Sequence, residues 1–282
     1  MWSIVAICLG LSSCDDPVDP VGECVCCNRE AQGLPRAPLD TLSLPQFLSG
    51  RPVLVLTPPG YDTTSDRYPV LYTADAQEFF ARKDGWYGDR TIPRMIGDKA
   101  IPPIIVVAIM SLEGLDRIGD LAPWNDFYMG TAIEGTGDLF LLALRDTLKP
   151  EIDARYRTLP DAENTMILGE SIAGLLALYA GYAYDSTFAH CAAASPTLAW
   201  GRRSELFFGA REKPRLRHLY MDMGTVDDNS IVQMNSVADI FRDQGFVDGV
   251  DLMVVVAEGH NHTPACWGER LPGMLRFMQG AP

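Results

Sequence analysis

The sequence lacks any apolar run of the roughly 18 residues that a membrane-spanning helix needs. It is also short of basic residues, since 23 Lys and Arg stand against 37 Asp and Glu, a formal net charge of −14. So acidic a surface repels the phosphates of nucleic acids and the headgroups of anionic lipids. We therefore expect a protein that binds no nucleic acid and does not dock on membranes through its charge.

Histidine is scarce as well, with only four in 282 residues. Any mechanism that uses an imidazole as a base therefore has few candidates. The sequence contains no internal repeat. Hydrophobic residues make up 47% of the chain, which is enough to bury the core of one full α/β domain.

The N-terminus resembles an export signal, although no Lys or Arg precedes the short apolar run at residues 2–11. This run ends in Leu11-Ser12-Ser13-Cys14, which resembles a bacterial lipobox, whose cysteine is lipidated and begins the mature chain. We expect residues 1–13 to be the signal segment and Cys14 to be the lipidation site. Residues 14–42, rich in Pro, Asp and Gly at their start, are predicted to be a tether. The expected location is the bacterial cell envelope, with membrane contact through the lipid anchor only; a secreted protein is the alternative.

Three cysteines, Cys24, Cys26 and Cys27, crowd the predicted tether. No second cluster of thiolates or histidines stands near them, so they do not indicate a zinc site. The pair His260 and His262 lacks an evident third metal ligand. We expect no metal and no cofactor, and we interpret the cysteines as forming a disulfide, within the chain or with another chain.

Residues 43–282 alternate apolar runs with segments of helical pattern. Several predicted strands are continuous Val, Ile and Leu runs, as strands covered on both faces require. The pattern predicts an α/β domain with a mostly parallel central sheet and helices on both faces, and in such a sheet the site lies beyond the carboxyl ends of the strands. The predicted strands are 53–57, 68–74, 104–109, 165–169, 189–194, 219–223 and 252–257, and the predicted helices are 137–155, 172–184, 231–244 and 264–279.

One predicted strand-to-helix turn carries a candidate nucleophile. Gly169-Glu170-Ser171-Ile172-Ala173 follows an apolar run and leads into a helix of small residues. This layout matches the nucleophile elbow G-x-S-x-G, with alanine in its last position. The hydroxyl of Ser171 would project from a tight turn, and the N–H of Ile172 at the helix start could hold an oxyanion.

A serine nucleophile needs a base, and the base needs an acid that orients it. His260 and His262 follow the last predicted strand and precede the last helix, whereas His190 and His218 lie in or at the start of strands, where a structural role is expected. Two adjacent acids, Asp227 and Asp228, follow the preceding strand. Either of them could reach a histidine while the other caps the next helix, so both remain candidates.

From about residue 52 onward the chain resembles a group of α/β-hydrolase esterases. The group includes siderophore (enterochelin) esterases, S-formylglutathione hydrolases, feruloyl and acetylxylan esterases, and mycolyltransferases. In this group four residues separate a histidine from a tryptophan, as they separate His262 from Trp267, and the acid three residues after a strand-end glycine corresponds to Asp227. The resemblance therefore implies Ser171, His262 and Asp227 as the catalytic residues. The matching segments are 58–62, 67–72, 104–109, 117–120, 148–152, 156–158, 169–173, 195–196 and 224–227.

The second oxyanion donor is implied by the same resemblance. The group carries Asp-Gly after its second conserved strand, where this chain has Asp75-Ala76, so the N–H of Ala76 or Gln77 is the candidate. The elbow also departs from the group, with Ala173 in place of a glycine. The expected function is hydrolysis of a small-molecule carboxylic ester through an acyl-enzyme. An acyltransferase of the same fold and a catalytically weak binding lipoprotein are the alternatives.

Overall fold

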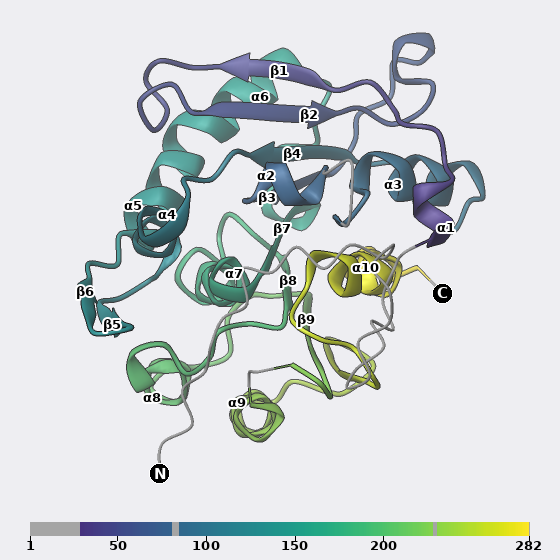
Figure 1. Cartoon of the computed structure of the whole chain (residues 1–282). Helices are drawn as coiled ribbons and strands as arrows, with labels where there is room; N and C mark the ends of the chain where they lie inside the picture. The colour runs from purple at the N-terminus through teal and green to yellow at the C-terminus, as the bar shows by residue number, and fades with distance from the viewer. Residues whose placement is uncertain (1–28, 81–84, 228–229, 282) are drawn as a thin grey trace, which may run out of the picture.

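The structure is a computed structural model that describes residues 29–80, 85–227 and 230–281 (Figure 1). The predicted signal segment, Cys14 and the three cysteines of the predicted tether lie outside the described residues. Their assignments stay predictions.

A mixed sheet of eight strands forms the centre of the molecule, and the predicted α/β class is confirmed. Six neighbouring strands run parallel, and β2 and β1 extend the sheet in antiparallel pairing beyond β4. The seven predicted strands are all present, with shifts of a few residues at their ends. In spatial order the strands are β1 (Asp40–Ser43), β2 (Pro52–Leu56), β4 (Ile105–Ile109), β3 (Val70–Thr73), β7 (Thr165–Glu170), β8 (His190–Ala194), β9 (His218–Gly224) and β10 (Leu252–Ala257).

These strands are continuous apolar runs. Because successive side chains of a strand point to opposite faces of the sheet, both faces are apolar. In β4, Ile105 and Val107 belong to one hydrophobic cluster while Val106 belongs to another. Figure 1 shows α5 and α7 on one side of the sheet and α3 and α10 on the other. Burial on both faces explains why the runs contain so few polar residues.

Ten α-helices are described in the structure, including those predicted from the sequence. The predicted helix over 137–155 is interrupted by a π-helical stretch, Leu144–Leu148, which ends two residues before Pro150, a residue with no N–H to continue the hydrogen-bond ladder. The helices are α1 (Arg29–Gln32), α2 (Ala76–Phe79), α3 (Gly88–Gly97), α4 (Gly114–Leu121), α5 (Gly137–Ala143), α6 (Lys149–Arg155), α7 (Ser171–Ala183), α8 (Ser204–Gly209), α9 (Ile231–Asp243) and α10 (Pro264–Met278).

Strand β1 crosses the predicted boundary between tether and domain at residues 42 and 43. It pairs along its length with β2, from Asp40 opposite Val55 to Ser43 opposite Pro52. Helix α1 also lies within the predicted tether and contacts α3. The ordered fold therefore includes part of the segment that its composition assigned to a spacer.

A small hairpin that the sequence did not predict, β5 (Asp126–Tyr128) and β6 (Thr131–Ile133), precedes α5. Two tryptophans connect the start of this hairpin to the segment after β8. The indole N–H of Trp124 donates to the carbonyl of Trp200 at 2.8 Å, and the indole N–H of Trp200 donates to the carbonyl of Trp124 at 2.7 Å. Each side chain thus satisfies the backbone of the other, and the segment after β8 holds the hairpin.

None of the helices in the described residues combines the length and the apolar character that crossing a bilayer demands.

Candidate functional site

Ser171 lies at the junction of β7 and α7 in a strained backbone conformation. Its φ angle is +55°, in the left-handed region that non-glycine residues seldom adopt. The turn depends on Gly169, because a Cβ there would stand 2.3 Å from the carbonyl oxygen of Ala173. The structure therefore forms the sharp strand-to-helix turn that the sequence predicts for a nucleophile elbow.

The start of α7 presents backbone N–H groups beside this serine. Ile172 is the second residue of the helix, where an N–H has no partner within the helix. The methyl group of Ala173, the departure from the elbow pattern, is buried in the core. The turn has no room for a side chain at Gly169, but it does have room for the methyl group of Ala173.

The segment after β8 packs on the elbow. The N–H of Thr197 donates to the carbonyl of Ser171 at 3.0 Å, and the two hydroxyl oxygens lie 3.3 Å apart. Within the described residues, the hydrogen bond of the Ser171 hydroxyl is the one to Thr197 and not one to His262. In this structure the Ser171 hydroxyl is therefore oriented toward Thr197.

The structure brings His262 and Asp227 together. Nδ1 of His262 lies 2.9 Å from Oδ1 of Asp227, and the carboxylate is fully buried while the imidazole is 24% exposed. The edge of the imidazole packs against Trp267, with ring centroids 4.9 Å apart and planes at 87°. A buried carboxylate on Nδ1 fixes the orientation of the ring and leaves Nε2 as the atom that can exchange a proton.

Two loops at the carboxyl ends of β9 and β10 make this pairing possible. The N–H of Thr225 donates to the carbonyl of Ala257, and the N–H of Val226 donates to the carbonyl of His260, each at 3.0 Å. Gly224 allows the contact, because a Cβ there would stand 2.0 Å from the carbonyl oxygen of His260. The sequence shows this glycine, but only the structure shows that it lets the loop carrying Asp227 approach the loop carrying His262.

The other predicted candidates are placed elsewhere. Nε2 of His260 faces Glu269 at 3.7 Å, and burial, with a smaller effect of Arg270, lowers the pKa of His260. His190 and His218 lie at the starts of β8 and β9 with their Nδ1 atoms 3.0 Å apart, at the opposite ends of these strands from Asp227. Residue 228, the alternative acid, lies outside the described residues. Ser230 caps α9 with its own hydroxyl.

Ala76 and Gln77 begin α2 directly after β3, beside β7 in the sheet. Their N–H groups belong to the first turn of the helix and have no intrahelical acceptor. The preceding residue, Asp75, has φ +52°, and its N–H donates to the hydroxyl of Ser111 at 3.0 Å. The Ser111 N–H in turn donates to Oε1 of Gln77 at 3.1 Å, so β4 supports the turn.

A buried ionic group that the sequence did not reveal stabilises the end of β8. Arg270 on α10 lies 3.0 Å from Asp222 in β9 and donates to the hydroxyl of Ser195 at 2.9 Å. The hydroxyl of Tyr220 also donates to Asp222, at 3.0 Å. Burial, opposed by Arg270, raises the pKa of Asp222 to about 6. This group immobilises the segment that reaches Thr197 and hence the elbow.

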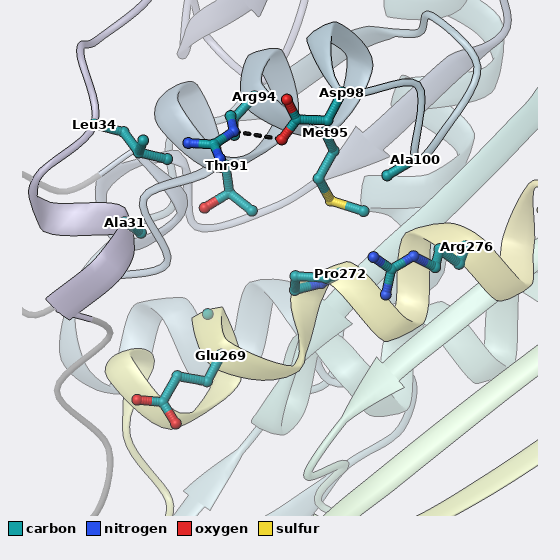
Figure 2. A pocket seen from close by; sticks show the side chains of 11 residues that line it. Ala31, Leu34, Thr91, Arg94, Met95, Asp98, Ala100, Glu269, Pro272 and Arg276 are labelled. Carbon is teal, nitrogen blue, oxygen red and sulfur yellow. Dashed lines mark hydrogen bonds and ion pairs between the residues drawn. The ribbon is translucent and has the colours of Figure 1, made fainter.

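A cavity of about 400 Å³ lies between α1, α3 and α10, as Figure 2 shows, and none of the predicted site residues lines it. A much smaller cavity lies behind the elbow, and Ala74 and Ala173 are among the residues that line it. Its volume of about 10 Å³ admits no more than a water molecule. This cavity is therefore too small to hold a small-molecule ligand.

Within the described ranges, no group of three or more His, Cys, Asp or Glu side chains is arranged to hold a metal ion. The two described cysteines differ in state. Cys191 is a buried free thiol in β8, and burial raises its pKa. Cys266, at the start of α10, is disulfide-bonded, and its Sγ accepts the N–H of Asn261 at 3.3 Å, next to His262.

Comparisons with known proteins concern the fold and the family of the chain. The Bacillus subtilis protein YbbA, described as uncharacterized, is 20% identical over 221 residues, which is 74% of this chain and 85% of that protein. The enterobactin esterase FES from Shigella flexneri, solved with 2,3-di-hydroxy-N-benzoyl-serine, has a TM-score of 0.68 and 18% identity over 91% of this chain. This chain spans 63% of that esterase. The feruloyl esterase module from Clostridium thermocellum, complexed with sinapinate, has a TM-score of 0.69 and 13% identity over 89% of this chain and 92% of the module.

At these identities the structural likeness establishes the α/β-hydrolase fold, as the sequence predicted. The resemblance to siderophore and feruloyl esterases is confirmed by the family comparison, in which residues 47–278 match the family described as Putative esterase. This match covers most of the chain and spans both the elbow and the His262 loop. The chain therefore belongs to the Putative esterase family of carboxylic-ester hydrolases.

Proposed function

We propose that the protein is a serine esterase that hydrolyses its substrate through an acyl-enzyme. The observation that carries this proposal is the left-handed Ser171 turn at the carboxyl edge of the sheet, together with the Asp227–His262 hydrogen bond that follows β9 and β10 at the same edge. Strained serine turns of this kind expose a hydroxyl for attack. The order Ser, Asp, His along the chain is that of α/β-hydrolases.

In the first step, the hydroxyl of Ser171 attacks the ester carbonyl while Nε2 of His262 accepts its proton. Asp227 stabilises the imidazolium through Nδ1. The negative charge that forms on the carbonyl oxygen is held by the N–H of Ile172 and by the N–H of Ala76 or Gln77. The alcohol then leaves with the proton from His262, and Ser171 retains the acyl group.

In the second step, a water molecule replaces the alcohol. His262 removes its proton, the hydroxide attacks the acyl carbonyl, and the proton returns to Ser171 as the acid departs. Before the first step, the Ser171 hydroxyl must turn from Thr197 toward His262. Catalytic hydrogen bonds are often loose in unliganded enzymes and tighten when the substrate binds.

For the substrate we propose an ester of an aromatic acid. The FES structure was determined with a dihydroxybenzoyl-serine and the feruloyl esterase module with sinapinate, both of which carry an aromatic acyl group. A panel of acetyl, butyryl, feruloyl and catecholate-siderophore esters would test this preference. The highest kcat/KM for the acetyl ester would argue against an aromatic acid, and acyl transfer to an added alcohol would indicate the acyltransferase alternative.

The central test is the substitution Ser171→Ala. It is expected to abolish both the hydrolysis of p-nitrophenyl acetate and labelling by a fluorophosphonate probe, because each requires the serine oxygen. Thr197→Ala is the matched control, since it removes the neighbouring hydroxyl and leaves the nucleophile. Undiminished labelling of Ser171→Ala would overturn the proposal.

We further propose that the domain is attached to the bacterial cell envelope through a lipidated Cys14. Support comes from the lipobox-like sequence at residues 11–14, the apolar run before it and the Pro- and Asp-rich segment after it. Stable anchoring requires more than one acyl chain, which bacterial lipoproteins carry.

A further inference from the structure

A buried ionic group joins the two turns that carry the proposed oxyanion donors. Arg117 of α4 donates from Nε and Nη2 to the two carboxylate oxygens of Asp75, each at 2.6 Å. Its Nη2 also lies 3.8 Å from Oε1 of Glu170, the last residue of β7. The side chain of Asp75 is fully buried and that of Glu170 is 2% exposed, so the guanidinium links two carboxyl groups that water does not reach.

The pKa values of the two carboxyl groups are shifted in opposite directions. Burial, and then the charge of Asp75, raises the pKa of Glu170 well above its ordinary value. Burial also acts to raise the pKa of Asp75, but the charge and hydrogen bonds of Arg117 outweigh it and lower that pKa. A single guanidinium cannot support two buried carboxylates. Asp75 therefore ionises at a lower pH than Glu170, and between the two transitions a protonated Glu170 can donate a hydrogen bond to an ionised Asp75 that pairs with Arg117.

Each carboxyl residue stands next to a proposed part of the active site. Asp75 directly precedes Ala76, and Glu170 directly precedes Ser171. Both turns are strained, with φ +52° at Asp75 and +55° at Ser171. Strained turns persist only where their surroundings hold them. The oxyanion donors on these turns must converge on one oxygen at about 3 Å, so the distance between the turns matters.

We propose that Arg117 is a positioning residue that sets the spacing of the two oxyanion donors, and that Glu170 is its second attachment point. The inference rests on the proposed function. Arg117 holds the β3 turn through a two-pronged contact with Asp75 and holds the β7 turn through Glu170. It touches neither substrate nor reacting atoms and acts only through the geometry of the N–H groups.

The arrangement predicts a characteristic response to alkaline pH. When Glu170 ionises, two carboxylates share one guanidinium and repel each other, so the turns separate. Glu78 of α2 faces the same group, and burial followed by the charge of Asp75 raises its pKa. Ser111, after β4, contributes only its hydroxyl. The relative contributions of Glu78 and Glu170 are separated by substituting each in turn.

The test uses Arg117→Gln, with Arg51→Gln as its matched control. Arg51 pairs with Asp120 of the same helix α4 at 2.5 Å, is similarly buried and lies outside the proposed oxyanion turns. Arg117→Gln is expected to lower kcat for p-nitrophenyl acetate by about 10²–10³ while KM changes by less than about threefold. Arg51→Gln should retain the wild-type kcat. A folded Arg117→Gln with wild-type kcat would overturn the inference.

A second pair of variants covers the case in which Arg117→Gln fails to fold. Glu170→Gln keeps a donor toward Asp75 but cannot ionise, whereas Glu170→Ala loses the contact. The glutamine variant is expected to have a higher kcat than the alanine variant. It should also lose the decline of kcat at alkaline pH, whereas Glu78→Gln should keep that decline. An alkaline decline in Glu170→Gln that matches the wild type would overturn the inference. Ser171→Ala separates the two proposals, because its residual activity would refute the serine mechanism itself.

Discussion

Gly224 offers a sharp test of how the acid and base are brought together. In Gly224→Ala, the new Cβ would stand 2.0 Å from the carbonyl oxygen of His260, and real Cβ contacts essentially never fall below 3.0 Å. The difference between 3.0 and 2.0 requires a movement of at least 1.0 Å between the two loops. These loops carry Asp227 and His262, whose hydrogen bond is 2.9 Å long.

Because a misplacement of 1 Å can lower a rate by about 10²-fold, we expect kcat for p-nitrophenyl acetate to fall by at least about that factor. Gly273→Ala, in α10, is the control. A Cβ at Gly273 meets nothing within 4 Å, and alanine stabilises a helix by about 1 kcal/mol relative to glycine. The control should therefore keep its activity and gain thermal stability.

The assay is steady-state hydrolysis, with circular dichroism to confirm that both variants fold. The fluorophosphonate probe then reports the reactivity of Ser171 separately from turnover. A folded Gly224→Ala with wild-type kcat and wild-type labelling would refute the claim that the contact of these loops aligns the acid and the base.

Three further predictions concern the base, a buried acid and the N-terminus. His262→Ala is expected to lower kcat by about 10⁴ or more, and His260→Ala by less than about tenfold, because His262 hydrogen-bonds to Asp227 whereas His260 faces Glu269; the reverse order would exchange their roles. Burial raises the pKa of Asp222 to about 6, above the value of about 4 expected in the unfolded chain, so its stabilising effect is complete below pH 4 and is lost as the pH rises through 6. Urea unfolding should show that the free energy of unfolding of the wild type falls relative to Asp222→Asn by about 3 kcal/mol between pH 4 and 7, whereas a constant difference would contradict the assignment. Mass spectrometry of the mature N-terminus is expected to find a lipidated Cys14, and Cys14→Ser should move the protein from the membrane fraction to the soluble fraction; an unmodified chain that starts elsewhere would indicate ordinary secretion.

Much of the fold could be predicted because its strands are buried on both faces. A run such as Ile105–Ile109 has no polar face, and this property is visible in the residues themselves. Helix α4 was missed because it is short, contains two glycines and buries only Leu121 fully. Strands β5 and β6 have three residues each, too few to establish an alternation.

The candidate site divides in the same way. Ser171 lies in a local pattern that the sequence displays directly, whereas His262 is distinguished from His260 only by the spacing to Trp267 that the family resemblance implies. The group formed by Asp75, Arg117 and Glu170 could not be predicted, since its members are 42 or more residues apart and meet only when the sheet is assembled. The pKa shifts of these residues depend on their proximity in the folded chain, which neither the composition nor the sequence spacing reveals.

The reciprocal contact between Trp124 and Trp200 connects the hairpin to the Ser171 turn. It joins the hairpin, whose Phe127 and Met129 are exposed, to the segment in which Thr197 holds the carbonyl of Ser171. The hairpin and the Ser171 turn therefore lie at the two ends of one chain of hydrogen bonds that runs through Trp124, Trp200 and Thr197.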